Sequence, residues 1–131
     1  MAVTHTTTVR DGIVDYVVDL IDAGTAGKLI FRLTGTAASP GTQVATLTFS
    51  ATAFGASSGG TATANTITPD SSATGNATAV STATLEDSAG TVCAHCSVGG
   101  PSSGEDIELS SATIAAGETV SVSTLSYTGP S

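Results

Sequence analysis

A β-strand is predicted at Lys28-Leu29-Ile30-Phe31-Arg32-Leu33-Thr34, because the apolar residues of this segment follow a two-residue period. Leu29, Phe31 and Leu33 share one face of the extended chain, and the two basic residues of the stretch lie on the other. A turn signal follows at residues 39–41, and residues 44–49 repeat the alternation. The two segments together predict a β-hairpin.

Downstream of the hairpin, the same alternation recurs in short segments separated by turns. A loop anchored by Phe54 covers residues 51–60, and strands are predicted at 61–68, 76–85, 91–98, 107–109 and 119–127. In the last segment the apolar parity changes between Val122 and Leu125, which predicts a β-bulge. About seven short strands of this kind predict an antiparallel β-sandwich or a jelly-roll-like domain.

Upstream of the hairpin, residues 6–24 predict the one helix, although a strand built from the same β-branched residues is the alternative. Thr8 and Asp11 suggest a capping box, and Gly24 suits the end of the helix. Four carboxylates fall largely opposite the apolar stripe and predict a solvated face: Asp11, Asp15, Asp19 and Asp22. The apolar stripe itself consists of Val9, Ile13, Val14, Val17, Val18, Leu20 and Ile21.

The composition predicts one domain with a thin core. The 131 residues (1–131) divide into the helix at about 6–24 and a β domain at about 28–128. Hydrophobic residues make up 40% of the chain, but many are alanine, aromatic residues make up only 4%, and tryptophan is absent. The Ala/Thr/Ser/Gly bias raises disorder as an alternative, against which the regular alternation argues. Large side chains supply most of the hydrophobic free energy of folding, and this chain has few of them. We therefore expect oligomerisation to add stability.

The charge of the chain restricts its partners. Three basic residues stand against eleven acidic ones, for a net charge of −8. Nucleic acid and anionic membrane surfaces are therefore excluded as partners, since both are bound through lysine and arginine. The sequence holds no apolar run long enough to span a bilayer, and its first residues do not resemble a secretory signal, which predicts synthesis in the cytoplasm.

One cluster in the sequence could carry chemistry, namely Cys93-Ala94-His95-Cys96. It could form a redox pair, or half of a zinc site completed by His5 or by another subunit. In a strand, however, the two cysteines point to opposite faces roughly 10 Å apart, beyond the reach of a disulfide. We therefore expect two free cysteines, with Cys96 in the core beside Val92, Ala94 and Val98, and Cys93 facing outward.

No other residues form a catalytic or cofactor-binding pattern. Neither His5 nor His95 belongs to a recognisable triad, and the acidic residues Glu105, Asp106 and Glu108 lack the spacing of a calcium loop. The Gly59-Gly60 and Gly99-Gly100 pairs are not followed by the lysine of a phosphate loop. The sequence thus predicts a protein that is not an enzyme and that uses neither a cofactor nor a metal ion.

Four segments together resemble small structural proteins of tailed bacteriophages. They are residues 7–24 (TTVRDGIVDYVVDLIDAG) running into 27–31 (GKLIF), residues 53–56 (AFGA), residues 61–65 (TATAN) and residues 107–128 (IELSSATIAAGETVSVSTLSYT). Some proteins of this kind are capsid decoration, or cement, proteins. The resemblance implies a location on the outer capsid surface of the virion, binding to the major capsid protein at junctions between its copies, and a trimeric or dimeric state. It implies no catalytic residues.

Three functional hypotheses follow. A virion assembly protein would bury apolar residues against its neighbours, with interface candidates in the helix (Val9, Ile13, Val17) or in the β domain (Leu29, Phe31, Leu33, Phe54). A tail or other virion β component, or a glycan- or host-surface-binding module, is the alternative. A glycan-binding module would depend on Phe54, Tyr16 and Tyr127 as exposed aromatics. An enzyme is the third hypothesis, and no acid, base or nucleophile cluster supports it.

Overall fold

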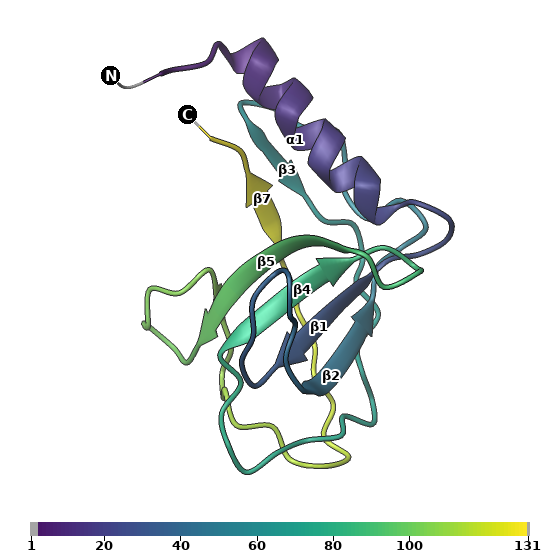
Figure 1. The fold of residues 1–131 in the computed structure, drawn as a ribbon, viewed down its shortest axis with the longest axis vertical. Helices are drawn as coiled ribbons and strands as arrows, with labels where there is room; N and C mark the ends of the chain where they lie inside the picture. Colours follow the sequence, from purple (N-terminus) through teal and green to yellow (C-terminus); the bar gives the residue numbers. More distant parts are fainter. Residues whose placement is uncertain (1–2, 131) are drawn as a thin grey trace.

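The computed structural model describes residues 3–130 as a mainly β fold with one N-terminal helix (Figure 1). Five strands form one sheet in the order β2-β1-β4-β5-β6, and two more form a separate sheet, β3-β7. The elements are α1 (Thr7–Ile21), β1 (Lys28–Arg32), β2 (Gln43–Thr48), β3 (Thr61–Thr63), β4 (Thr82–Glu86), β5 (Val92–Gly99), β6 (Ile107–Glu108) and β7 (Ser126–Thr128).

The larger sheet is mixed and strongly curled. β1 pairs antiparallel with β2 on one side and with β4 on the other, so Phe31 lies opposite both Ala45 and Ala83. β4 and β5 form a second antiparallel pair, whereas β6 runs parallel to β5. The predicted hairpin and the predicted strand at residues 91–98 are therefore confirmed, and this strand runs antiparallel to β4.

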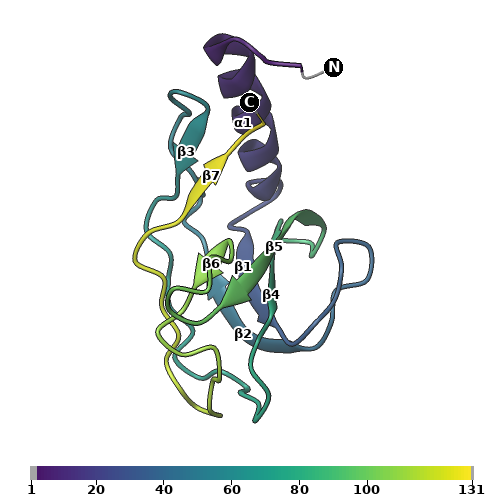
Figure 2. The same ribbon diagram turned by 90° about the vertical axis from the view of Figure 1, so that its left-hand side faces the viewer.

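The two sheets do not form a clear sandwich or jelly roll. Figure 2 shows the helix and the small β3-β7 sheet at one end of the molecule, and the five-stranded sheet at the other. α1 contacts β3, β5 and β7, so the helix joins the two sheets. The prediction of a mainly β chain with an N-terminal helix is confirmed at this coarser level.

One hydrophobic cluster connects the helix with both sheets. Leu29, Phe31 and Leu47 have no exposed surface, and Val14 and Ile21 bring the inner side of α1 into the same cluster. The ring of Phe49 lies 5.6 Å from that of Phe54, centroid to centroid, which fastens the 51–60 loop to the sheet. Burial of these few large side chains supplies most of the hydrophobic stabilisation.

The opposite face of β1 carries a buried charge network that the sequence did not reveal. The guanidinium of Arg32 forms an ion pair with Glu86 at 2.6 Å, and both side chains are almost fully buried. Arg32 also donates to the Thr84 hydroxyl at 3.0 Å and to the Gly41 carbonyl at 2.7 Å, while Thr84 donates to Glu86. β1 is thus covered on both faces. A buried pair needs such additional hydrogen bonds to offset its desolvation.

Three predicted strands are much shorter than expected, and the predicted strand at 107–109 ends one residue early, as β6. Residues 61–68 are a strand only over β3, residues 76–85 only from Thr82, and residues 119–127 only from Ser126, so the predicted bulge between Val122 and Leu125 is absent. In the rest of these segments, single contacts take the place of continuous strand pairing. The Asn76 side chain accepts from the Thr78 N–H, and Val120 forms an isolated bridge with Asp70. Alternation favours an extended chain, but a strand also needs a continuous neighbour.

The helix lies within the predicted range but begins and ends differently. Thr6 is the N-cap residue and its side chain makes no capping bond, while Thr8 lies inside the helix, so the predicted capping box is wrong. The helix ends at Ile21 with Asp22 as C-cap, and Gly24 lies just beyond it with a φ of +88°. Glycine adopts this conformation without steric cost.

Candidate functional site

The outer side of α1 is the main exposed apolar surface of the described residues. Their exposed large hydrophobic side chains are Val3, Val9, Tyr16 and Leu20, all within the first twenty residues of the chain. Tyr16 is 68% exposed and Val9 is 46% exposed. Clustering of this kind marks an interaction surface more often than scattered single residues do.

The apolar residues of α1 form two stripes rather than the single broad stripe expected. The inner stripe (Val14, Val18 and Ile21) is buried in the core. We define the outer stripe as Val9, Ile13, Tyr16, Val17 and Leu20, of which Ile13 and Val17 are half-buried. Positions 9, 13, 16 and 20 of the outer stripe are spaced by four, three and four residues, which places them on one side of the helix. The helix can therefore pack against the core and against a neighbour at once.

Carboxylates of α1 hold the helix in this orientation. Asp11 accepts the Gly60 N–H at 2.6 Å, Asp15 accepts the Ser57 N–H at 2.8 Å, and Asp22 accepts the Ala53 N–H at 2.8 Å. The predicted solvated acidic face is therefore wrong for these three residues, which bind the backbone of residues 53–60. Only Asp19 of the four is exposed. Charge-assisted bonds of this type are stronger than neutral ones.

The interface candidates in the β domain lie in the core of the chain itself. Leu29 and Phe31 have no exposed surface, Phe54 is 4% exposed, and Leu33 is half-buried against the core. Leu29, Phe31 and Phe54 are not available to a neighbour, because the other residues of the chain already cover them, whereas Leu33 keeps part of its surface exposed. Of the candidates named from sequence, Val9, Ile13, Val17 and Leu33 therefore keep exposed surface, and Tyr16 and Leu20 join those of the helix.

The cysteine cluster has the features of a structural element. Both cysteines are free and half-buried on β5. Leu85 pairs with Ala94 and Glu86 pairs with Val92, so Cys93 is the extra residue of a β-bulge. Cys93 packs against the core while keeping part of its surface exposed, so the prediction that it faces outward is met only in part.

The thiols of this cluster are poorly suited to redox or metal chemistry. Burial raises the pKa of Cys96 to about 12, with the Asp106 charge acting in the same direction. Burial and the charge of Asp87 also raise the pKa of Cys93. The thiolate is the reactive and metal-binding form, and both environments disfavour it. Among the described residues, no group of three or more His, Cys, Asp or Glu side chains could hold a metal ion.

The remaining polar candidates mostly serve local structure. Glu108 accepts the Ser102 and Gly104 N–H groups, and Asp106 accepts the Ser97 N–H at 2.8 Å. These carboxylates close the loop before β6. Glu105 and His5 are exposed and lie far apart along the chain. His95 differs, because its Nε2 is buried without a hydrogen-bond partner in the described part of the chain.

In comparisons with known proteins, no family model, curated protein or solved structure matches the chain. Across residues 3–130, no helix is long and apolar enough to cross a membrane.

Two features of the site were missed from sequence. The outer stripe could have been separated from the inner one, because positions 9, 13, 16 and 20 and positions 14, 18 and 21 follow two different helical rows. The sequence gives weaker evidence for the Arg32–Glu86 ion pair. The evidence is one basic and one acidic residue at the ends of two apolar strands.

Proposed function

We propose that this chain is a non-enzymatic structural protein of a tailed bacteriophage virion, namely a capsid decoration protein that binds the outer head surface. The proposed partners are the major capsid protein and further copies of the chain in a dimer or trimer. The outer stripe of α1 is the observation that carries the proposal, because a helix that is apolar on two sides needs a second surface to cover it. The proposal requires a small β domain but neither a sandwich nor a jelly roll.

The charge and the surface of the chain support this role. A net charge of −8 disfavours contact with packaged DNA, whereas a stripe of uncharged side chains can be desolvated at low cost. The three carboxylate bonds to residues 53–60 orient the stripe before any partner arrives. A preformed surface loses less entropy on binding, and many copies on one shell add avidity.

A tail component, or another β component of the virion, would use the same surface and remains the alternative. A glycan-binding module has less support. Of its three aromatic candidates, Phe54 is buried and Tyr127 is half-buried, which leaves Tyr16 on a convex helix. Sugar sites are usually concave and present several aromatic or polar groups together.

Co-expression with the major capsid protein encoded beside its gene tests the proposal. We expect the chain to co-sediment with the shells and to raise the temperature at which they break. The double variant Tyr16→Ser/Leu20→Ser should lose at least about tenfold in occupancy, the equivalent of 1.4 kcal/mol. The matched control is Ala37→Ser/Ala38→Ser, which changes exposed residues of the β1–β2 loop and should bind normally. A wild-type chain that stays monomeric and never co-sediments would contradict the proposal.

A further inference from the structure

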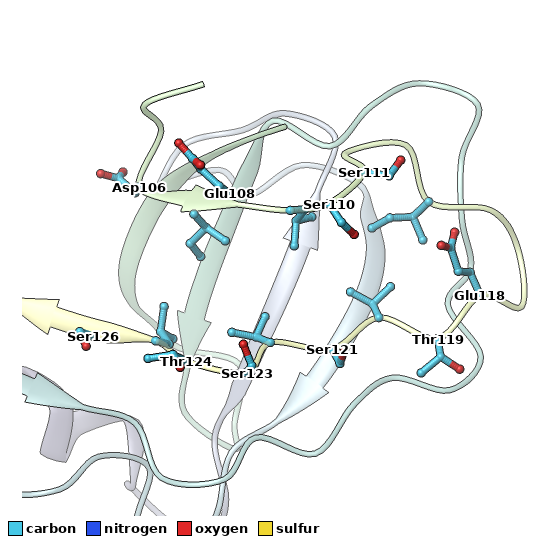
Figure 3. A pocket seen from close by; sticks show the side chains of 16 residues that line it. Asp106, Glu108, Ser110, Ser111, Glu118, Thr119, Ser121, Ser123, Thr124 and Ser126 are labelled. Carbon is cyan, nitrogen blue, oxygen red and sulfur yellow. The ribbon is translucent and has the colours of Figure 1, made fainter. Parts of the chain in front are cut away.

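A long slot separates the edge of the five-stranded sheet from the C-terminal segment. Its larger part is a cavity of about 620 Å³ between β6 and residues 118–126 (Figure 3). A second hollow of about 340 Å³ shares residues with it and extends along β5 and β7. The shared lining residues are Asp106, Ile107, Leu125 and Ser126. Figure 3 shows β6 and the 119–126 segment running along opposite walls of the larger cavity.

Both walls of this slot carry backbone groups without partners. Leu109 donates to the Gly99 carbonyl of β5, and alternate residues of a strand bond the same neighbour. The N–H and C=O of Glu108 therefore point away from β5, toward the slot. On the other wall, Val120 is bonded to Asp70, and Leu125 accepts from Ala64.

Between these two attachments the C-terminal wall is unpaired. The N–H groups of residues 121–124 donate to no acceptor in the described part of the chain. The chain bends at Ser123, and unpaired backbone beside a slot is a template for an added strand where its N–H and C=O groups face outward. The slot thus has the backbone complement for a strand inserted between β6 and the C-terminal segment.

The side chains around the slot select the kind of strand. Asp106, Glu108 and Glu118 line it, and no lysine or arginine lines either hollow. Hydrogen bonds from the Ser97 N–H and hydroxyl lower the pKa of Asp106, so this carboxylate is charged at neutral pH. The hydroxyls of Ser110, Ser121 and Ser123 alternate with apolar residues along the same walls. An acidic strand would be repelled, and a basic or uncharged one would be attracted.

We propose that this slot accepts an extended peptide segment of a partner chain, one that carries lysine or arginine and no acidic residue. The segment adds a strand between β6 and residues 119–126, and its backbone bonds Glu108 on one side and the slot-facing backbone groups of residues 121–124 on the other. Basic side chains of the guest are attracted by the negative charge of these carboxylates, which stay bonded to the chain's own backbone, and alternate side chains meet the apolar positions of the walls. This surface lies in the β domain, apart from the outer stripe of α1, and the inference does not depend on the proposed function.

A second copy of the chain is the less favourable occupant. Two copies, each with a net charge of −8, repel one another unless a basic region of one meets the slot of the other. The chain has only three basic residues, and Arg32 is buried in its ion pair. A partner with a basic extended arm fits the charges better.

Hydrogen exchange on the intact chain at neutral pH tests the inference with a defined probe. The probe is a capped decapeptide of alternating threonine and lysine at about 1 mM. We expect the amide of Glu108 and at least one amide of residues 121–124 to be protected at least about tenfold, while those of β1 stay unchanged. The same peptide with every threonine N-methylated keeps its charge but loses one row of backbone donors, and it should give no protection. A threonine–glutamate peptide should not bind.

Two variants separate the slot from the rest of the surface. Ser123→Trp places a large side chain in the slot and should weaken binding of the probe at least about tenfold. Ser71→Trp makes the same change at an exposed position outside the slot and should leave binding unchanged. Both variants must retain the exchange pattern of β1, which shows that they fold.

Several results would overturn the inference. Equal binding of the methylated and unmethylated peptides would show charge attraction without strand pairing. Protection elsewhere than Glu108 and residues 121–124 would place the peptide on another surface. Concentration-dependent protection of residues 121–124 without any peptide would identify a second copy as the occupant and contradict the charge argument. None of these outcomes bears on shell binding through α1, which the co-sedimentation experiment measures.

Discussion

The central strands β1 and β4 and the C-terminal residues 119–128 have similar sequence patterns but very different surroundings. β1 lies between β2 and β4, and β4 lies between β1 and β5. The C-terminal residues are paired where Val120 meets Asp70, where Leu125 accepts from Ala64, and where β7 meets β3. Leu29 and Phe31 are fully buried as a result, while Val122 and Leu125 are half-buried.

Alternation therefore predicts an extended chain, whereas the stability of a strand depends on the neighbours on each side of it. In the centre, both faces of the strands are covered and even charged groups find partners, as Arg32 and Glu86 do. At the C-terminal edge, the backbone of residues 121–124 is left for a partner. Substitutions in the two regions should therefore differ in the stability that they cost.

The largest effect is expected in the centre, from Arg32→Met. This change leaves Glu86 buried without its cation, which costs about 3–5 kcal/mol. A loss of this size is a large fraction of the stability of a small domain. A lowered urea midpoint, followed by circular dichroism, measures it.

A double variant keeps this prediction testable even if Arg32→Met does not fold. Arg32→Met/Glu86→Leu removes both charges and should recover most of the lost stability, since no buried charge is then unpaired. The control Lys28→Met changes a half-buried residue of the same strand and should shift the free energy of unfolding by less than about 1 kcal/mol. Equal losses for Arg32→Met and Lys28→Met would show that the pair is not buried as described.

A matched pair of leucines compares the two regions directly. Leu47→Ala removes a side chain with no exposed surface and should cost about 2–5 kcal/mol. Leu125→Ala removes a half-buried side chain at the C-terminal edge and should cost about 1 kcal/mol. Chemical denaturation of both variants gives the comparison. Similar losses would mean that the C-terminal segment packs as tightly as the centre.

A smaller effect is expected at acidic pH, at the edge where β5 meets β6. The Ser97 N–H and hydroxyl lower the pKa of Asp106 below its usual 3.8. The bond therefore contributes stability above pH 3.8, and this contribution is lost as the pH falls through the lowered pKa. We expect the Ser97 amide NMR signal to titrate with a midpoint below 3.8, and Asp106→Asn to abolish the titration. A midpoint at or above 3.8 contradicts the bond.

The smallest expected effect distinguishes the two cysteines of β5 without changing stability. The pKa of Cys96 is raised to about 12 and its side chain is the more deeply buried, so iodoacetamide at pH 8 should alkylate Cys93 at least about tenfold faster. Mass spectrometry of the peptides over time measures the ratio, which should approach one in urea. Faster alkylation of Cys96 would place it outside the core.

Local features of the fold could be predicted, and features that join distant residues could not. The helix, the β1–β2 hairpin and the antiparallel return of β5 each depend on short-range periodicity and turn residues. The Arg32–Glu86 pair joins residues 54 positions apart, and the Asp15–Ser57 bond joins residues 42 apart. No local pattern determines such contacts. The alanine–threonine alternation of residues 76–81 was also misleading, because that segment has no strand beside it.

The candidate site divides in the same way. The acidic character of the chain, a helix within residues 6–24 with a broad apolar stripe, and the thin core of the β domain all follow from the sequence. Only the tertiary structure decided which stripe of α1 is covered, that three carboxylates bind residues 53–60, and that a slot remains beside β6. The physical reason is that side-chain type and spacing act within a few residues, whereas burial depends on which distant segments are brought together.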